Sequence, residues 1–190
     1  NFVPDSLEQN LAAIDDIGGP KHFNHYPWGW TWAGNTPFRR WKREVHEGGV
    51  ADPLIVHWPA RVPTGHGAAL RRQYVHAIDL VPTILEAVGV EAPQEIRGVA
   101  QRPIEGVSFL DTLADPQAPD RHVTQYYEMF GQRGIWHQGW KAVAEHGPMA
   151  GMSNFDGDRW QLFHTDVDRS EAHDVADEHA EKVEELKALW

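Results

Sequence analysis

The spacing of apolar residues changes near His122, and this change constrains the fold more than any other feature of the chain. Alternating apolar and polar residues in 122–130 and 134–146 predict two β-strands joined by a glycine-containing turn. Residues 159–165 predict a third strand, and 177–190 predict a helix. Three residues of this helix are expected to face inward: Val183, Leu186 and Trp190. The pattern predicts a small antiparallel sheet closed by a terminal helix.

The preceding part of the chain is typical of an α/β layer. Leu54–Trp58 is a short apolar run between prolines, which predicts a buried strand. Asp79 is expected to cap a helix that ends at Gly89, with an apolar stripe on one side. A strand followed by a helix indicates an α/β layer. Further helices are predicted from Ser6 to Gly18 and over Val107–Leu113, and the stripe comprises Leu80, Ile84 and Val88.

Composition excludes several classes of function. The 190 residues carry a net charge of −11, which argues against a nucleic-acid or anionic-membrane partner and favours solubility. The absence of cysteine excludes a thiol nucleophile or thiolate metal ligands within the chain. No apolar run approaches the ~20 residues needed to cross a bilayer. The first residues lack the pattern of a signal peptide, and we expect them to lie inside a longer protein.

Residues 20–38 are rich in aromatic side chains, glycine and proline, which predicts an ordered loop. The tryptophans of this segment, Trp28, Trp30 and Trp32, are expected to pack against the sheet. Alternatively, the segment forms an apolar wall for an aromatic or sugar substrate, and both roles can coexist. His25 and Tyr26 are therefore pocket candidates.

Lys42 stands among arginines in an otherwise acidic chain and is followed by Glu47-Gly48-Gly49. A glycine pair lets the backbone approach another group closely. A cation beside such a bend could meet an anionic ligand, whereas Glu47 is expected to brace the turn. The spacing of the twelve histidines does not favour a metal site, and no phosphate-binding glycine loop or serine-hydrolase motif is present.

The order of several segments resembles the type I sulfatases, more closely the bacterial arylsulfatases of the alkaline-phosphatase-like superfamily. Lys42 with Glu47-Gly48-Gly49 resembles a K-x-x-x-x-E-G-G block, and "PLIVHWPARV" resembles the strand after it. "HAIDLVPTILEAVGV" resembles a D-x-x-P-T helix, and "GVAQRPIEGVSF" resembles the segment after that helix. "GQRGIWHQGWKAV" and the closing stretch from Trp160 resemble the family's final strands and tail. These segments cover nearly the whole chain.

The resemblance also shows which family motifs are missing. The C/S-x-P-x-R nucleophile motif and the Asp-Asp and Asp-Asn-Gly metal ligands have no counterpart here. The resemblance therefore implies the C-terminal portion of a sulfatase: residues 1–118 from the main α/β domain and 119–190 as the antiparallel-sheet subdomain. It implies Ca²⁺ and formylglycine in the full-length parent, and neither in this portion, which is expected to be inactive alone. Lys42 would contact a sulfate oxygen of a small sulfate ester.

Two alternatives stay open at the level of sequence. Phosphodiesterases and phosphonate monoester hydrolases share this superfamily and parts of the Lys42–Gly49 region. The second alternative is a non-catalytic module that binds a glycan or a partner through the aromatic segment. The compartment, cytoplasmic or periplasmic, and the oligomeric state are not predicted by any feature of the sequence.

Overall fold

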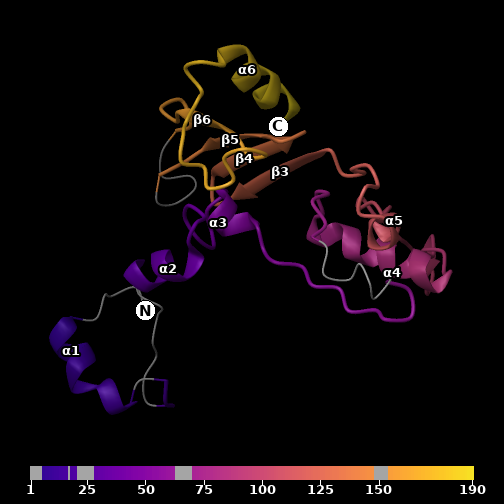
Figure 1. Cartoon of the computed structure of the whole chain (residues 1–190), viewed down its shortest axis with the longest axis horizontal. Helices are drawn as coiled ribbons and strands as arrows, with labels where there is room; N and C mark the ends of the chain where they lie inside the picture. The colour runs from indigo at the N-terminus through magenta and orange to yellow at the C-terminus, as the bar shows by residue number, and fades with distance from the viewer. Residues whose placement is uncertain (1–5, 17, 21–27, 63–69, 148–153) are drawn as a thin grey trace.

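The computed structural model describes residues 6–16, 18–20, 28–62, 70–147 and 154–190 (Figure 1). Helical elements dominate up to residue 114, and the main sheet follows. The helices are α1 (Leu7–Ala12), η1 (Ile14–Asp16), α2 (Trp28–Asn35), α3 (Glu47–Val50), η2 (Ala77–Asp79), α4 (Leu80–Val88), α5 (Leu110–Ala114) and α6 (Ala180–Leu189). The strands are β1 (Glu95–Ile96), β2 (Val99–Ala100), β3 (Thr124–Met129), β4 (Gln132–His137), β5 (Trp140–Ala144) and β6 (Trp160–His164).

Strands β3 to β6 form one antiparallel sheet in chain order, and β1 pairs only with β2. The single strand predicted over 134–146 is wrong, because this segment forms β4 and β5, which pair through Trp136 and Lys141. Gln138 and Gly139 between them both have positive φ, 47° and 82°. Two such residues in succession make a tight hairpin turn, which reverses the chain.

Both faces of this sheet are covered. On one face, Ile135, Ala142 and Leu162 pack with Val183 and Leu186 of α6. On the other face, Val143 and Phe163 pack with Val45, which precedes α3. The predicted antiparallel sheet and closing helix are confirmed. Trp190 is 43% exposed rather than facing inward.

The aromatic segment differs from its prediction. Trp28–Asn35 is the helix α2 and not a loop. Trp28 and Trp30 are 75% and 66% exposed, so they do not pack against the sheet. Trp28 and Trp32 are one helical turn apart, and both rings contact Trp41, at centroid distances of 5.4 and 5.7 Å. The helix predicted from Ser6 to Gly18 is shorter than expected, because α1 ends at Ala12 and is followed by η1.

The strand predicted at Leu54–Trp58 is absent, and Ile55 is 89% exposed. A strand requires a hydrogen-bonded neighbour, and none of the described strands pairs with this segment. Helix α4 forms as predicted and ends at Gly89 in the left-handed conformation. The prediction that the Asp79 carboxylate caps this helix is wrong. The Asp79 side chain instead accepts from the backbone N–H groups of His76 and Val107.

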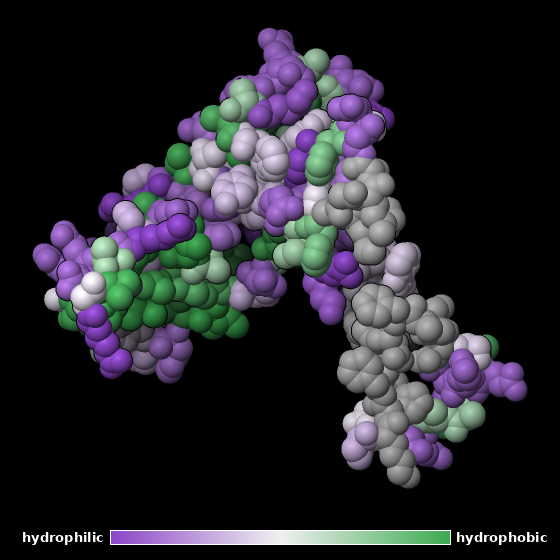
Figure 2. Space-filling model, turned by 180° about the vertical axis from the view of Figure 1, so that it is seen from behind, coloured by the Kyte–Doolittle hydropathy of each residue, from purple (hydrophilic) through white to green (hydrophobic). Residues whose placement is uncertain are grey.

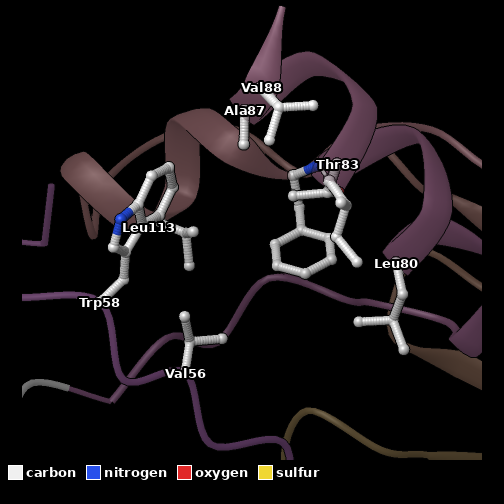
Figure 3. Close-up of a pocket in the computed structure, with 9 residues that line it drawn as sticks. Val56, Trp58, Leu80, Thr83, Ala87, Val88 and Leu113 are labelled. Carbon is white, nitrogen blue, oxygen red and sulfur yellow. Dashed lines mark hydrogen bonds between the residues drawn. The ribbon is translucent and has the colours of Figure 1, made fainter. Parts of the chain in front are cut away.

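The predicted apolar stripe of α4 is exposed and not buried. It borders a groove whose other walls come from the 54–58 segment and from α5 (Figure 3). Figure 2 shows a continuous hydrophobic area over this part of the molecule. The residues that line the groove are Val56, Trp58, Leu80, Thr83, Ile84, Ala87, Val88, Phe109 and Leu113. Within the described ranges, no helix has the length and apolar character needed to cross a membrane.

Candidate functional site

The segment that carries Lys42, residues 39–49, is a closed loop that follows α2 and ends within α3. The side-chain Nδ2 of Asn35 donates to the carbonyls of Arg40, at 2.6 Å, and Gly48, at 2.9 Å. The N–H of Gly48 donates to the carbonyl of Arg39 at 2.9 Å. These bonds hold the two ends of the loop together and so restrict the position of the residues between them.

Gly48 and Gly49 are required by the packing of this loop. A Cβ on Gly48 would lie 2.3 Å from the carbonyl oxygens of Arg39 and Arg40, and one on Gly49 would lie 2.1 Å from that of Glu44. The close backbone approach expected at the glycine pair is therefore present. The groups that the two glycines approach are carbonyls of the loop's own backbone. Both glycines lie within the single helical turn α3.

Lys42 is exposed at the tip of the loop. Its neighbours are engaged: Arg40 Nη2 is 2.6 Å from Glu145 Oε1, and the guanidinium of Arg43 lies over the ring of Phe130 at 4.9 Å. Within the described part of the chain, Lys42 forms no ion pair. It borders a depression together with Thr31, Gly34, Asn35, Trp41 and Gly48. The arrangement leaves the Lys42 ammonium available to an anion.

Glu47, five residues further on, belongs to a buried ion triad that the sequence analysis missed. Lys141 Nζ lies 2.8 Å from Glu47 Oε1 and 3.1 Å from Glu171 Oε1. Lys141 and Glu171 are fully buried, and Glu47 is nearly so. The expectation that Glu47 braces the turn agrees with these contacts. Sequence reasoning could not find the triad, because the two partners of Lys141 are 94 and 30 positions away along the chain.

Glu171 of the triad and two partly buried tyrosines have raised pKa values. Burial raises the pKa of Glu171 above its usual range, and the Lys141 ammonium opposes this rise. Burial also raises the pKa of Tyr74 to about 12, despite the hydrogen bond between its hydroxyl and that of Tyr127. The Tyr127 pKa is raised as well, chiefly by burial. Neither phenol is therefore ionised near neutral pH.

His46 is buried between the loop and the sheet. Burial, followed by the positive charge of Arg39, lowers its pKa to about 4. Its Nε2 lies 3.2 Å from Gln161 Oε1, to which the neutral ring donates. The ring also lies 6.0 Å from that of Phe163. At neutral pH, His46 is thus an uncharged packing residue.

The predicted site residues are not all placed by the structure. His25 and Tyr26 lie outside the described residues. Across the described ranges, no group of three or more His, Asp or Glu side chains could hold a metal ion. Glu47 and Glu171 come together, but Lys141 lies between them and occupies the position that a cation would need. These residues therefore do not fit a calcium site.

Curated relatives with sequence similarity are sulfatases. An uncharacterized sulfatase of Schizosaccharomyces pombe is 26% identical over 181 residues, which is 94% of this chain and 31% of the relative. Arylsulfatase K of Xenopus laevis is 27% identical over 77% of this chain and 26% of its own. N-acetylgalactosamine-6-sulfatase of Canis lupus familiaris is 32% identical over 48% of this chain and 16% of its own. The chain thus spans a third or less of the length of these relatives.

Solved structures show the same fold. A protein from the core locus for metabolism of glycosaminoglycans in Bacteroides thetaiotaomicron superposes with a TM-score of 0.57 at 21% identity, over 96% of this chain and 34% of that one. The crystal structure of Ps i-CgsB gives 0.56 at 24% identity, over 80% of this chain and 30% of that one.

A protein-family model described as N-sulphoglucosamine sulphohydrolase, C-terminal, matches residues 39–189, which include the Lys42 loop, the ion triad, the sheet and α6. The chain belongs to this sulfatase family and corresponds to its C-terminal portion.

Proposed function

We propose that the whole protein of which this chain is the C-terminal portion hydrolyses sulfate esters, and that Lys42 binds the sulfate group. The observation that carries the proposal is the exposed ammonium of Lys42 on a closed loop, without an ion pair among the described residues. Family membership supports sulfuric ester hydrolysis as the reaction. His25 and Tyr26 are proposed to line the substrate pocket.

The contribution of Lys42 follows from the charge of the transferred group. Negative charge spreads over the non-bridging sulfate oxygens as the ester bond breaks, and a positioned cation stabilises that distribution. Lysine suits this role because its ammonium is a compact point charge with three donors. The calcium ion and formylglycine typical of the family would polarise the sulfate and supply the nucleophile. The residues described here do not fit the calcium ion, so only the role of Lys42 is proposed.

The substrate is proposed to be a small aryl or sugar sulfate. The aryl class follows from the arylsulfatase resemblance, and the sugar class from relatives such as N-acetylgalactosamine-6-sulfatase. The exposed tryptophans of α2 are neighbours of the Lys42 loop and offer apolar faces to either ring type. Comparing turnover of 4-nitrophenyl sulfate with that of a 6-sulfated amino sugar distinguishes the two classes.

Lys42→Ala in the full-length protein tests the proposal. Loss of one positioned donor to a developing anion costs about 10²–10³ in kcat, so turnover of the sulfate ester should fall by that factor. Lys187→Ala is the matched control, because Lys187 is a partly exposed lysine on α6, whose ammonium pairs with Glu184. It should retain wild-type kcat. Wild-type turnover in the Lys42→Ala protein would remove Lys42 from the reaction.

The other functions are tested in the same assays. Preferential cleavage of a phosphodiester or phosphonate monoester would favour the related phosphoesterases. Saturable glycan binding without turnover by the full-length protein would favour a binding module. The 190-residue chain alone is expected to be inactive. The proposed division at residue 118 would be tested by limited proteolysis, with cleavage expected near the Asp115–Arg121 connection.

A further inference from the structure

The buried ammonium of Lys141 joins the sheet to the loop that carries Lys42. Lys141 lies on β5, and its side chain points to the sheet face opposite α6, where Val45 and Phe163 also pack. Its Nζ contacts Glu47 Oε1 at 2.8 Å and Glu171 Oε1 at 3.1 Å. Glu47 is the first residue of α3, at the end of the Lys42 loop. The ion triad therefore connects β5, α3 and the segment after β6.

Glu171 ties down both ends of the loop. Its Oε2 accepts the backbone N–H of Glu47 at 2.8 Å, and its carbonyl accepts from Arg39 Nη1 at 3.4 Å. Glu171 itself has a φ of +54°, an uncommon conformation for a residue other than glycine. The surrounding contacts must hold this conformation in place. The start and the end of the loop thus share one buried anchor.

The charges make this anchor sensitive to Lys141. Two carboxylates face one buried ammonium. Among the described residues, the other cation that pairs with a carboxylate of the triad is Arg169, whose Nε is 3.6 Å from Glu47 Oε2 and whose side chain is 67% exposed. A buried carboxylate without a partner is strongly disfavoured. Removing the ammonium would force at least one carboxylate to take a proton or to move toward water, and either change weakens the link between α3 and the sheet.

We infer that Lys141 is a positioning residue for sulfate-ester hydrolysis: through Glu47 and Glu171, it holds the loop of residues 39–49 so that Lys42 meets the sulfate group. The inference rests on the proposed function of Lys42. It gives Lys141 of β5 a role beyond packing, because this buried lysine keeps the exposed Lys42 in place.

The test uses four versions of the full-length protein: wild type, Lys42→Ala, Lys141→Met and the double variant. Lys141→Met keeps a long unbranched side chain but removes the charge. Displacement of a catalytic group by about 1 Å can cost roughly 10²-fold in rate, so kcat should fall by about that factor. kcat is expected to fall while KM stays unchanged, because Lys141 does not touch the substrate. In the Lys42→Ala background, the same substitution should lower kcat by less than about threefold.

Hydrogen exchange supplies a readout that does not require activity. In Lys141→Met, amides of residues 44–50 should exchange at least about tenfold faster than in wild type, while those of β4 and β6 stay protected. Lys42→Ala should leave exchange in the loop unchanged. Lys182→Met is the matched control, because Lys182 is partly exposed on α6 and pairs with Glu185. It should change neither readout.

Glu47→Gln is the second variant if Lys141→Met does not fold. It keeps an oxygen acceptor for Lys141 and the backbone N–H that donates to Glu171, and a smaller loss of kcat with faster loop exchange is expected. Multiplicative losses of kcat in the double variant, or unchanged exchange at residues 44–50, would overturn the inference. Unchanged kcat in Lys42→Ala together with faster loop exchange in Lys141→Met would instead reject the proposed function and retain the anchor.

Discussion

Similar apolar residues are buried in the sheet β3–β6 but exposed in the region around α4. Leu162 and Phe163 of β6 are fully buried, because α6 covers one face of the sheet and the segment before α3 covers the other. Ile84 and Val88 of α4 are 60% and 64% exposed, although α4 has a well-formed apolar stripe. Local pattern therefore specifies both elements, but burial needs a covering layer, and the described residues supply one only to the sheet.

Truncation of Leu162, in the well-packed sheet, should have the largest effect on stability. Leu162→Ala removes a fully buried side chain between the sheet and α6, and it is expected to lower the free energy of unfolding by about 2–5 kcal/mol. Urea unfolding of the 190-residue chain, followed by circular dichroism, measures the change.

Ile84→Ala is the matched substitution on α4. Its side chain is mostly exposed, so the change in the free energy of unfolding should stay within about 0.5 kcal/mol. Equal losses for Leu162→Ala and Ile84→Ala in this chain would contradict the distinction. A larger loss for Ile84→Ala in the full-length protein would sharpen it, because it would show that another part of the protein covers α4.

Protonation of His46 should produce an intermediate effect on the sheet side. Its pKa is 6.5 in the unfolded chain and about 4 in the folded one, so the folded state binds fewer protons between these values. The free energy of unfolding should therefore fall as pH drops from about 6.5 to about 4, by roughly 3 kcal/mol in total. His46→Gln should remove this part of the pH dependence, measured by urea unfolding at pH 7 and pH 4.5.

His76, which precedes η2 and α4, sharpens the same test. Burial lowers its pKa as well, but it is less buried than His46. His76→Gln should therefore change the pH dependence in the same direction and by less. Glu171 acts in the opposite direction, because its raised pKa contributes stability that is lost as pH rises. The difference between variant and wild type, rather than the wild-type curve alone, is the relevant quantity.

Substitution of the packed glycine of α3 should have the smallest clear effect. In Gly49→Ala, the new Cβ would overlap the carbonyl of Glu44, and a loss of about 1–3 kcal/mol in the free energy of unfolding is expected. Gly157→Ala is the control, because nothing lies within 4 Å of a Cβ there, and it should be within about 0.5 kcal/mol of wild type. Thermal unfolding measures both, and equal stabilities would show that the loop is not tightly closed.

Much of the fold could be predicted because the signals were local. The alternation from His122 onward indicated the sheet, and the apolar spacing around Leu186 indicated α6. The prediction merges β4 with β5, because it does not take account of the turn that Gln138 and Gly139 form through their positive φ angles. The helix α2 was missed because two glycines weaken helix propensity, whereas contacts of two tryptophans with Trp41 favour it.

The candidate site could be predicted only in part. Lys42, Glu47 and the glycine pair were singled out from one short segment, and the structure adds the closure of their loop. The triad could not be predicted, because Lys141 and Glu171 come from segments far away along the chain. A lysine in a strand gives no indication of whether it faces water or a carboxylate.

Local sequence pattern is sufficient to specify where the helices α4 and α6 form and which segment alternates as a sheet, and the order of motifs marks the sulfatase family. These properties depend on residues within one or two turns of each other, or on motif order alone. Long-range contacts, in contrast, bury Lys141 while Lys42 is exposed, and they leave Leu54–Val56 without a partner among the described strands. Charge burial and strand pairing are set by groups brought together from distant parts of the chain, and local pattern does not contain them.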